Sequence, residues 1–178
     1  MPKRRVTRHE VTQPLNTSYR FIPLTKGQNA IVDVEDFEQM NQWNWCAHWN
    51  ERSQTFYATR NNGRDVKMHR VILGCKKGEE VDHINHNGLD NRKSNLRKCS
   101  SSQNSCNRRM RKDNTSGIKG VYWYKLRAQW KAQIQVNGKN KHLGFFSSKE
   151  EAAQIYSEAA KKLHGEFAFP GQLNYPAK

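Results

Sequence analysis

The stretch Val81–Asn104, VDHINHNGLDNRKSNLRKCSSSQN, decides how the middle of this chain folds. Residues 81–84 predict a short strand that carries an acid and a histidine side by side. An Asn-Gly pair at 87–88 begins a long polar loop, and 96–99 predict a second short strand. Ser100-x-x-Gln103 is a capping box, which opens a helix with Asn104 near its first turn. A strand–loop–strand–helix of this size is too small to bury a core of its own.

The charge around this stretch identifies the kind of partner. The chain has 178 residues and a formal net charge of +15, with 31 Lys+Arg against 16 Asp+Glu. Between residues 92 and 131 a single acid, Asp113, opposes twelve basic residues, so this window holds +11 of the total. Four aromatic residues, Tyr122, Trp123, Tyr124 and Trp130, are interleaved with the charge. A charge run is often a solvated face, but this combination favours a nucleic-acid surface.

Several protein classes are excluded. The chain is too short for a TIM barrel, which takes about 250 residues, and it has no run near the ~20 apolar residues of a membrane span. Charge at the start, in 1–8, precedes no apolar run, so we expect no secretory signal. Its four cysteines, Cys46, Cys75, Cys99 and Cys106, are too few and too scattered for a disulfide framework. We therefore expect a cytoplasmic protein.

Two segments precede the quoted stretch. Residues 1–20 predict a basic, flexible arm, and 21–65 predict a small mixed α/β module. Within the module, 33–40 have an Asp start and helical apolar spacing, while 45–49 and 56–60 predict strands around a polar turn. We expect Trp43, Trp45 and Trp49 to form its core.

A further unit follows the quoted stretch. Residues 109–116 lack apolar periodicity and predict a basic linker, and 117–175 predict a three-stranded antiparallel sheet followed by a helix. The strands are expected at 120–126, 130–136 and 141–146, with a hairpin turn at Asn137-Gly138. Ser148-x-x-Glu151 opens the helix, apolar residues then recur at helical spacing, and Gly165 ends it. The expected fold class is α+β.

The pattern of residues 66–108 resembles the His-Asn-His (HNH) endonucleases, in particular the phage and intron homing enzymes in which the third motif residue is asparagine. The resemblance implies a ββα-metal finger in which His83 is the general base and Asp82 and Asn104 bind one divalent ion. It also implies that Asn95 pins the loop and helps to orient the histidine. Because Asn104 replaces a histidine, the donors favour a hard ion, Mg²⁺ or Mn²⁺. We expect the finger to assemble around this metal and DNA.

The same chemistry is reasonable without the family. Imidazole can activate water near pH 7, and a carboxylate with an amide oxygen can hold a cation beside a phosphate. His69 is either an auxiliary site residue or a packing residue. A zinc site at His83, His86, Cys99 and Cys106 is the alternative, but its two cysteines are spaced too widely.

Residues 117–175 resemble the apetala-two/ethylene-response-factor DNA-binding domain. The resemblance is carried by Gly120-Val121, Trp130-x-Ala132-x-Ile134, Leu143-Gly144-x-Phe146, Glu151-Ala152-Ala153-x-x-Tyr156 and Ala159-Ala160. It implies a sheet that enters the major groove. Tyr122 and Tyr124 replace arginines of the plant domains, so the plant sequence preference does not carry over. The DNA-binding candidates are Arg70, Arg92, Arg97, Arg108, Arg109, Lys119, Tyr122, Tyr124, Lys125, Arg127, Gln129, Lys131, Gln133 and Gln135.

Together these features predict a site-selective DNA endonuclease, of the phage-encoded homing type, that hydrolyses phosphodiester bonds. Its expected partner is double-stranded DNA, and we expect no membrane association. We expect the protein to be a monomer or weak homodimer in the host cytoplasm. One site per chain predicts a nick, and a double-strand break requires two events. The alternatives are a DNA-binding regulator with an inactive nuclease remnant, or a nucleic-acid packaging protein, which does not call for the metal-site pattern.

Overall fold

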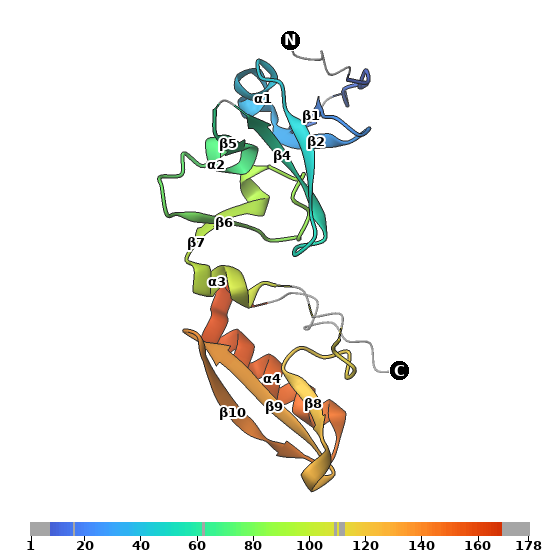
Figure 1. The fold of residues 1–178 in the computed structure, drawn as a ribbon, viewed down its shortest axis with the longest axis vertical. Helices are drawn as coiled ribbons and strands as arrows, with labels where there is room; N and C mark the ends of the chain where they lie inside the picture. Colours follow the sequence, from blue (N-terminus) through green and yellow to red (C-terminus); the bar gives the residue numbers. More distant parts are fainter. Residues whose placement is uncertain (1–7, 16, 62, 109, 111–112, 169–178) are drawn as a thin grey trace. The chain divides into compact units, whose positions relative to one another are not determined.

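The computed structural model describes residues 8–15, 17–61, 63–108, 110 and 113–168, which fall into two compact units, 1–99 and 100–178. Both are built from small antiparallel sheets with short helices, so the predicted α+β class is confirmed. The boundary between the units follows Cys99 and lies inside the segment predicted as one finger. Figure 1 shows the elements of each unit.

The first unit contains two two-stranded sheets and one three-stranded sheet. Its elements are β1 (Tyr19–Pro23), β2 (Asn29–Asp33), α1 (Val34–Asn41), β3 (Cys46–Asn50), β4 (Thr55–Asn61), β5 (Asp65–Lys67), α2 (Met68–Ile72), β6 (Glu80–His83), a 3-10 turn (Lys93–Asn95) and β7 (Leu96–Cys99). β1 pairs with β2, β3 with β4 and β4 with β5, and β6 with β7. The predicted helix at 33–40 and the four strands expected in this unit are therefore present, with ends shifted by one or two residues.

The core of the first unit includes one tryptophan instead of three. Trp45 is fully buried, but Trp43 and Trp49 are 39% and 36% exposed, so the expectation for these two was wrong. Ala47 and Trp49 are two residues apart on β3 and so lie on one face, where Ala47 is buried and Trp49, near the end of the strand, packs edge-on against Phe56 at 4.9 Å between ring centroids. Trp43 precedes β3 and stacks with the Arg60 guanidinium, 3.8 Å from its ring centroid.

The loop between β6 and β7 is supported by the N-terminal module. The backbone of Ile31 on β2 donates to the carbonyl of Leu89 and accepts from Asn91 N–H, each at 2.8 Å. Lys93 bonds Asp33 through its backbone N–H at 2.7 Å and Asp36 through its ammonium at 2.9 Å. Leu89 itself joins the buried core of β1, β2 and β3. The strand pair β6–β7 therefore packs on a core that residues earlier in the chain provide. The expectation that the finger has no core is corrected.

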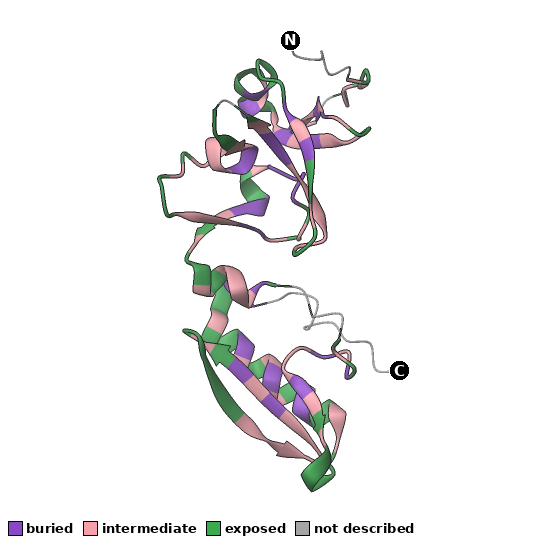
Figure 2. Cartoon of the chain, viewed as in Figure 1, coloured by how far each residue is buried: buried purple, intermediate pink, exposed green. Residues whose placement is uncertain are grey.

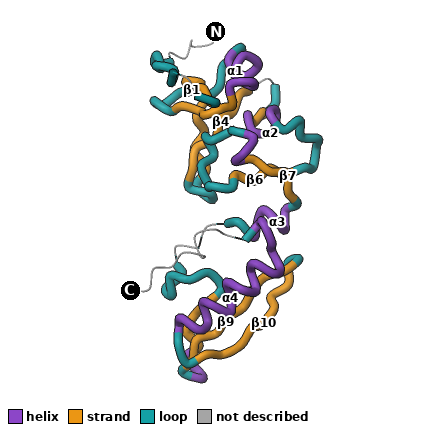
Figure 3. Tube along the Cα trace, turned by 180° about the vertical axis from the view of Figure 1, so that it is seen from behind, coloured by secondary structure: helices purple, strands orange, loops and turns teal. Residues whose placement is uncertain are grey.

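The second unit is a three-stranded sheet with a helix on one face. Its elements are α3 (Ser101–Cys106), β8 (Val121–Tyr124), a 3-10 turn (Lys125–Arg127), β9 (Gln129–Val136), β10 (Lys139–Phe146), α4 (Lys149–His164) and a 3-10 turn (Gly165–Phe167). The strand order is β10-β9-β8, and all pairs are antiparallel, as predicted. α4 covers one face of this sheet, as Figures 1 and 3 show from opposite sides.

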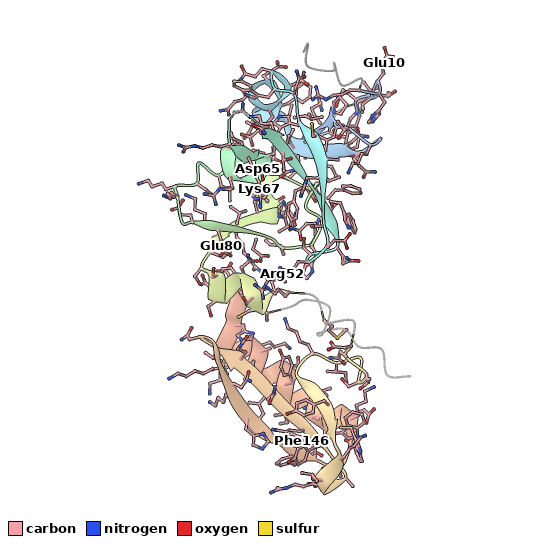
Figure 4. All side chains as sticks on the ribbon, in the orientation of Figure 1. Glu10, Arg52, Asp65, Lys67, Glu80 and Phe146 are labelled. Atoms are coloured by element: carbon pink, nitrogen blue, oxygen red, sulfur yellow. The ribbon has the colours of Figure 1, made fainter. Side chains whose placement is uncertain are left out.

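Turn and cap chemistry explains the ends of these elements. Asn137 and Gly138 both have positive φ, as the hairpin requires. The hydroxyl of Ser148 accepts from Glu151 N–H at 3.0 Å, and Gly165, at φ +54°, ends α4. The first predicted strand is shorter than expected because the chain turns at 125–127. Figure 2 shows the buried face of the sheet, and Figure 4 labels Phe146, which packs on that core.

The two predicted connecting segments are partly described. Residues 1–7 of the arm and 109, 111 and 112 of the linker lie outside the described residues. In the arm, Arg8 donates to the Trp45 carbonyl at 2.8 Å, and in the linker the Ser116 hydroxyl is buried and donates toward the Val121 carbonyl at 2.6 Å. Within the described parts of the chain, every helix is too short or too polar to cross a membrane.

Candidate active site

Asp82 and His83 are the last two residues of β6, and both are only 6% exposed. The Asp82 carboxylate pairs with Arg97, its cross-strand neighbour on β7, through bonds to Oδ2 of 2.9 Å from Nε and 2.6 Å from Nη2. The carboxylate and the imidazole are thus held on a two-stranded ribbon, with the carboxylate fixed by a guanidinium.

The His83 ring packs against two other rings. Its centroid lies 4.9 Å from that of His69 on α2 and 5.6 Å from that of Tyr57 on β4, both edge-on. Burial lowers the pKa of His83 to about 4, although a hydrogen bond with Asn91 and the Asp82 carboxylate oppose the shift. Burial and the neighbouring His83 lower the pKa of His69 to about 2. Both imidazoles are therefore neutral at pH 7, which is the form that accepts a proton.

Asn95 ties the loop that follows His83. Its Nδ2 donates to the Asp90 carbonyl at 2.8 Å, and its Oδ1 accepts from Asn85 N–H at 3.0 Å. Its own carbonyl accepts from Ile84 N–H at 3.0 Å. Asn95 is buried, and it has the contacts expected of a residue that pins the loop.

Asp90 is the second ionic centre of the loop. Arg92 binds it through Nε at 2.8 Å and Nη2 at 2.7 Å, and Asn85 donates to it at 2.9 Å. Burial raises the pKa of Asp90, but the bonds and charge of Arg92 outweigh this and leave the pKa below its ordinary value. The loop is therefore fixed by a bidentate ion pair between a buried carboxylate and a partly exposed guanidinium.

The arginines predicted near the site all make contacts within the protein. Arg97 and Arg92 pair with Asp82 and Asp90, and Arg70 donates to the carbonyls of Lys76 and Glu79. These bonds orient the three guanidinium groups, and they compete with any phosphate contact. Of the other two basic candidates beside the finger, Arg108 is exposed, and Arg109 lies outside the described residues.

Each of the two proposed metal donors is placed by its own unit. Asp82 lies on β6 of the first unit, and Asn104 lies on α3 of the second. A buried carboxylate and an amide oxygen fit a hard divalent cation, whose remaining ligands substrate and water oxygens can supply. Among the described residues no three His, Cys, Asp or Glu side chains gather in a way that could hold a metal. Burial also raises the pKa of the Cys99 thiol to about 12.

The sheet of the second unit collects most of the DNA-binding candidates on one face. Side chains of β9 alternate, so that Ala132 and Ile134 are buried under α4 while Lys131 and Gln133 point away. The Lys131 ammonium lies 5.6 Å from the ring centroid of Tyr122 and also 5.6 Å from that of Tyr124. The face so defined comprises Tyr122, Tyr124, Gln129, Lys131, Gln133, Gln135 and Phe145.

Beside this face the candidates differ in their surroundings. Lys125 and Arg127 are exposed on the turn after β8, and Arg127 stacks on Phe145 at 4.5 Å from its ring centroid. Lys119 is different, because its ammonium donates to the carbonyls of Cys106 and Arg108 at 2.6 and 2.8 Å.

Sequence reasoning missed several residues around both sites. Tyr57 joins the two histidines, Asp90 anchors the loop, and Phe145 with His142 extends the exposed sheet face, where their ring centroids lie 4.8 Å apart. Asp90 lies within Val81–Asn104, and its position two residues before Arg92 was the signal from which their contact could have been predicted. Tyr57 lies on a distant strand and carried no signal.

The sequence of this chain is similar to those of known proteins. The family model described as HNH endonuclease matches residues 66–106. An uncharacterised HNH endonuclease of Acanthamoeba polyphaga mimivirus is 40% identical over 156 residues, which cover 84% of this chain and 78% of the relative. The chain belongs to the HNH endonuclease family. Membership implies a nuclease, and nucleases of this family act on DNA and typically use a divalent metal.

Two further relatives match shorter parts of the chain. Protein 3.8 of Escherichia phage T7 is 38% identical over 92 residues, 52% of this chain and 75% of its own length. An ethylene-responsive transcription factor-like protein of Arabidopsis thaliana is 49% identical over 43 residues, 24% of this chain and 18% of its own length. The C-terminal segment is thus similar to an ethylene-response-factor-like protein. No solved structure matches the chain.

Proposed function

We propose that this chain is a site-selective DNA endonuclease of the homing type, in which the first unit supplies the general base and the second unit reads the site. One observation carries the proposal: the adjacent Asp82 and His83 are buried at the end of β6 within a loop that Asn95 fixes. An acid and an imidazole in such surroundings are the groups that phosphodiester hydrolysis needs.

In the proposed reaction His83 accepts a proton from the attacking water. The water oxygen forms a bond to phosphorus as the bond to the leaving oxygen breaks. Tyr57 and His69 restrict the orientation of the His83 ring through edge-on contacts. Asp82 and Asn104 would hold one Mg²⁺ or Mn²⁺ ion, which would supply stabilisation of charge on the phosphate and the leaving oxygen.

Substrate binding falls to the exposed face of the second unit. Lys131, with Arg127 at its edge, provides positive charge, and Tyr122, Tyr124 and Phe145 provide aromatic surface. Gln129, Gln133 and Gln135 carry amides suited to adenine edges. We propose double-stranded DNA as the partner of a monomer or weak homodimer, with a nick as the product of one site.

The test is cleavage of supercoiled plasmid that carries the DNA flanking the gene for this chain. Wild-type protein with Mg²⁺ should convert it to the nicked form, and EDTA should abolish the conversion. His83→Ala should bind the same DNA with unchanged affinity and lose cleavage. Binding without metal-dependent cleavage by the wild type would instead support the DNA-binding regulator with an inactive nuclease remnant.

A further inference from the structure

The helix that carries Asn104, α3, is short, and side chains cap both of its ends. At its N-terminus the Ser100 hydroxyl accepts from Gln103 N–H at 3.2 Å, and the Gln103 side chain accepts from Ser100 N–H at 2.8 Å. At its C-terminus the Lys119 ammonium donates to the carbonyls of Cys106 at 2.6 Å and Arg108 at 2.8 Å. The last carbonyls of a helix lack partners within it, so a cation there satisfies them and favours the helix dipole.

Lys119 is held in a tightly bonded turn of the second unit. The Asn114 Oδ1 accepts from Gly117 N–H at 2.9 Å, and its Nδ2 donates to the Ile118 carbonyl at 2.9 Å. The next residue, Gly120, has φ +72° and lies so close to Tyr156 and to the β9 backbone that a Cβ would not fit. Burial lowers the pKa of Lys119 to about 8. The ammonium is thus directed inward by its surroundings and bonded to α3.

A second contact joins α3 to the same unit. Its side chains line a cavity of about 290 Å³, opposite residues from the end of α4 and the turns beside it. These lining residues are Ser102, Gln103 and Cys106 on one side and Leu163, His164 and Phe167 on the other. Figures 1 and 3 both show α3 next to the C-terminal end of α4. α3 therefore belongs to the sheet domain, although the sequence assigns it to the finger.

We propose that Lys119 is a positioning residue that clamps α3, and with it Asn104, to the ethylene-response-factor-like domain. The proposal rests on the proposed function, because it takes Asn104 as a metal ligand. Through this clamp, the ethylene-response-factor-like domain fixes the position of the residue that is proposed as a metal ligand. Lys119 then contributes to cleavage without touching DNA, which separates it from the exposed basic residues of the same unit.

The test compares Lys119→Met, which keeps the apolar stem but removes the donors, with Lys161→Met at an exposed position on α4. Loss of the clamp should speed alkylation of Cys106, measured peptide by peptide with mass spectrometry, by about fivefold or more. Cleavage of the flanking-DNA plasmid should slow by about 10- to 100-fold, with a higher Mg²⁺ requirement, as for other groups that orient a ligand. Affinity for the same DNA in EDTA should match that of Lys161→Met.

Two results would overturn the clamp. Unchanged Cys106 alkylation would mean that Lys119 does not hold α3. Weaker DNA binding in EDTA, with a salt slope lower by about 0.9 and unchanged cleavage of bound DNA, would make Lys119 a phosphate contact.

Two further variants keep the test decisive. If circular dichroism shows that Lys119→Met does not fold, Lys119→Gln takes its place. This variant retains a donor, so the same effects are expected at smaller magnitude. Asn104→Ala is measured in parallel. Full Mg²⁺-dependent cleavage by Asn104→Ala would refute the proposed metal ligand and leave the alkylation result to decide whether the clamp exists.

Discussion

Replacing Asn95 with alanine tests whether the candidate site is held together by hydrogen bonds in its loop. The substitution removes a donor to the Asp90 carbonyl and an acceptor for Asn85 N–H, and it leaves the backbone contacts of the 3-10 turn intact. We expect a local effect, because both partners lie in the same loop of the first unit.

The two lost bonds differ in cost. Asp90 is 2% exposed, so its carbonyl is left buried without this partner, at about 1–3 kcal/mol. Asn85 is exposed, and water can take over its N–H, so this loss costs about 1 kcal/mol. The sum is about 2–4 kcal/mol, and each 1.4 kcal/mol is roughly a factor of ten in the opening equilibrium.

The assay is hydrogen–deuterium exchange of the full chain, followed by mass spectrometry of peptides that span 81–99. Asn95→Ala should lower protection there by about 30- to 1000-fold, up to the limit set by global unfolding. Asn41→Ala, at the exposed end of α1, is the matched control, and peptides of β9 serve as an internal reference. Exchange in 81–99 within about threefold of the control would refute the pinning role.

Three other outcomes are expected. Because Asp90→Asn loses the ion pair with Arg92, it should be less stable than the wild type by about 1–2 kcal/mol at pH 7. The folded-state pKa of Asp90 lies below the ordinary 3.8, so the difference in urea midpoint between the two proteins should close as the pH falls through that pKa. A difference that is unchanged at acid pH would contradict this. Gly120→Ala places a Cβ 2.4 Å from a backbone oxygen and should lower the unfolding free energy of the second unit, followed by a thermal melt, by about 3 kcal/mol or more. Gly138→Ala, whose Cβ would have nothing within 4 Å, should lower it by about 1 kcal/mol. Lys131→Met should lower the salt slope of DNA binding by about 0.9, and an effect no larger than that of Lys162→Met would exclude Lys131 as a phosphate contact.

Local signals in the sequence predicted most of the secondary structure. The Asn137-Gly138 turn and the capping box of Ser100 and Gln103 appear as expected, because each rests on interactions between near neighbours. The burial of Trp43 and Trp49 was predicted wrongly, since Trp43 precedes β3 and Trp49 lies near its end, and no local signal specifies how far along the strand the core extends.

The candidate site was predictable in its motif and not in its surroundings. The pattern identified the adjacent Asp82 and His83, and the structure gives Asn95 the contacts of a loop-pinning residue. Their packing partner Tyr57 comes from a strand far earlier in the chain, so only the tertiary fold brings it to the imidazole. The pattern placed Arg97 among the DNA-binding candidates from its charge, and only the fold shows that this charge lies against the Asp82 carboxylate across the ribbon.

The bridge between Ile31 and the loop that carries Leu89 has a consequence for how such a nuclease can recombine with other genes. An exchange limited to the matched residues 66–106 would transfer the Asp82–His83 pair but leave Leu89 and Met68 without the apolar neighbours that β1 and β2 provide. The recipient chain would inherit a motif without its core. The smallest segment that can pass between genes as a folded piece therefore begins before β1, well upstream of the motif.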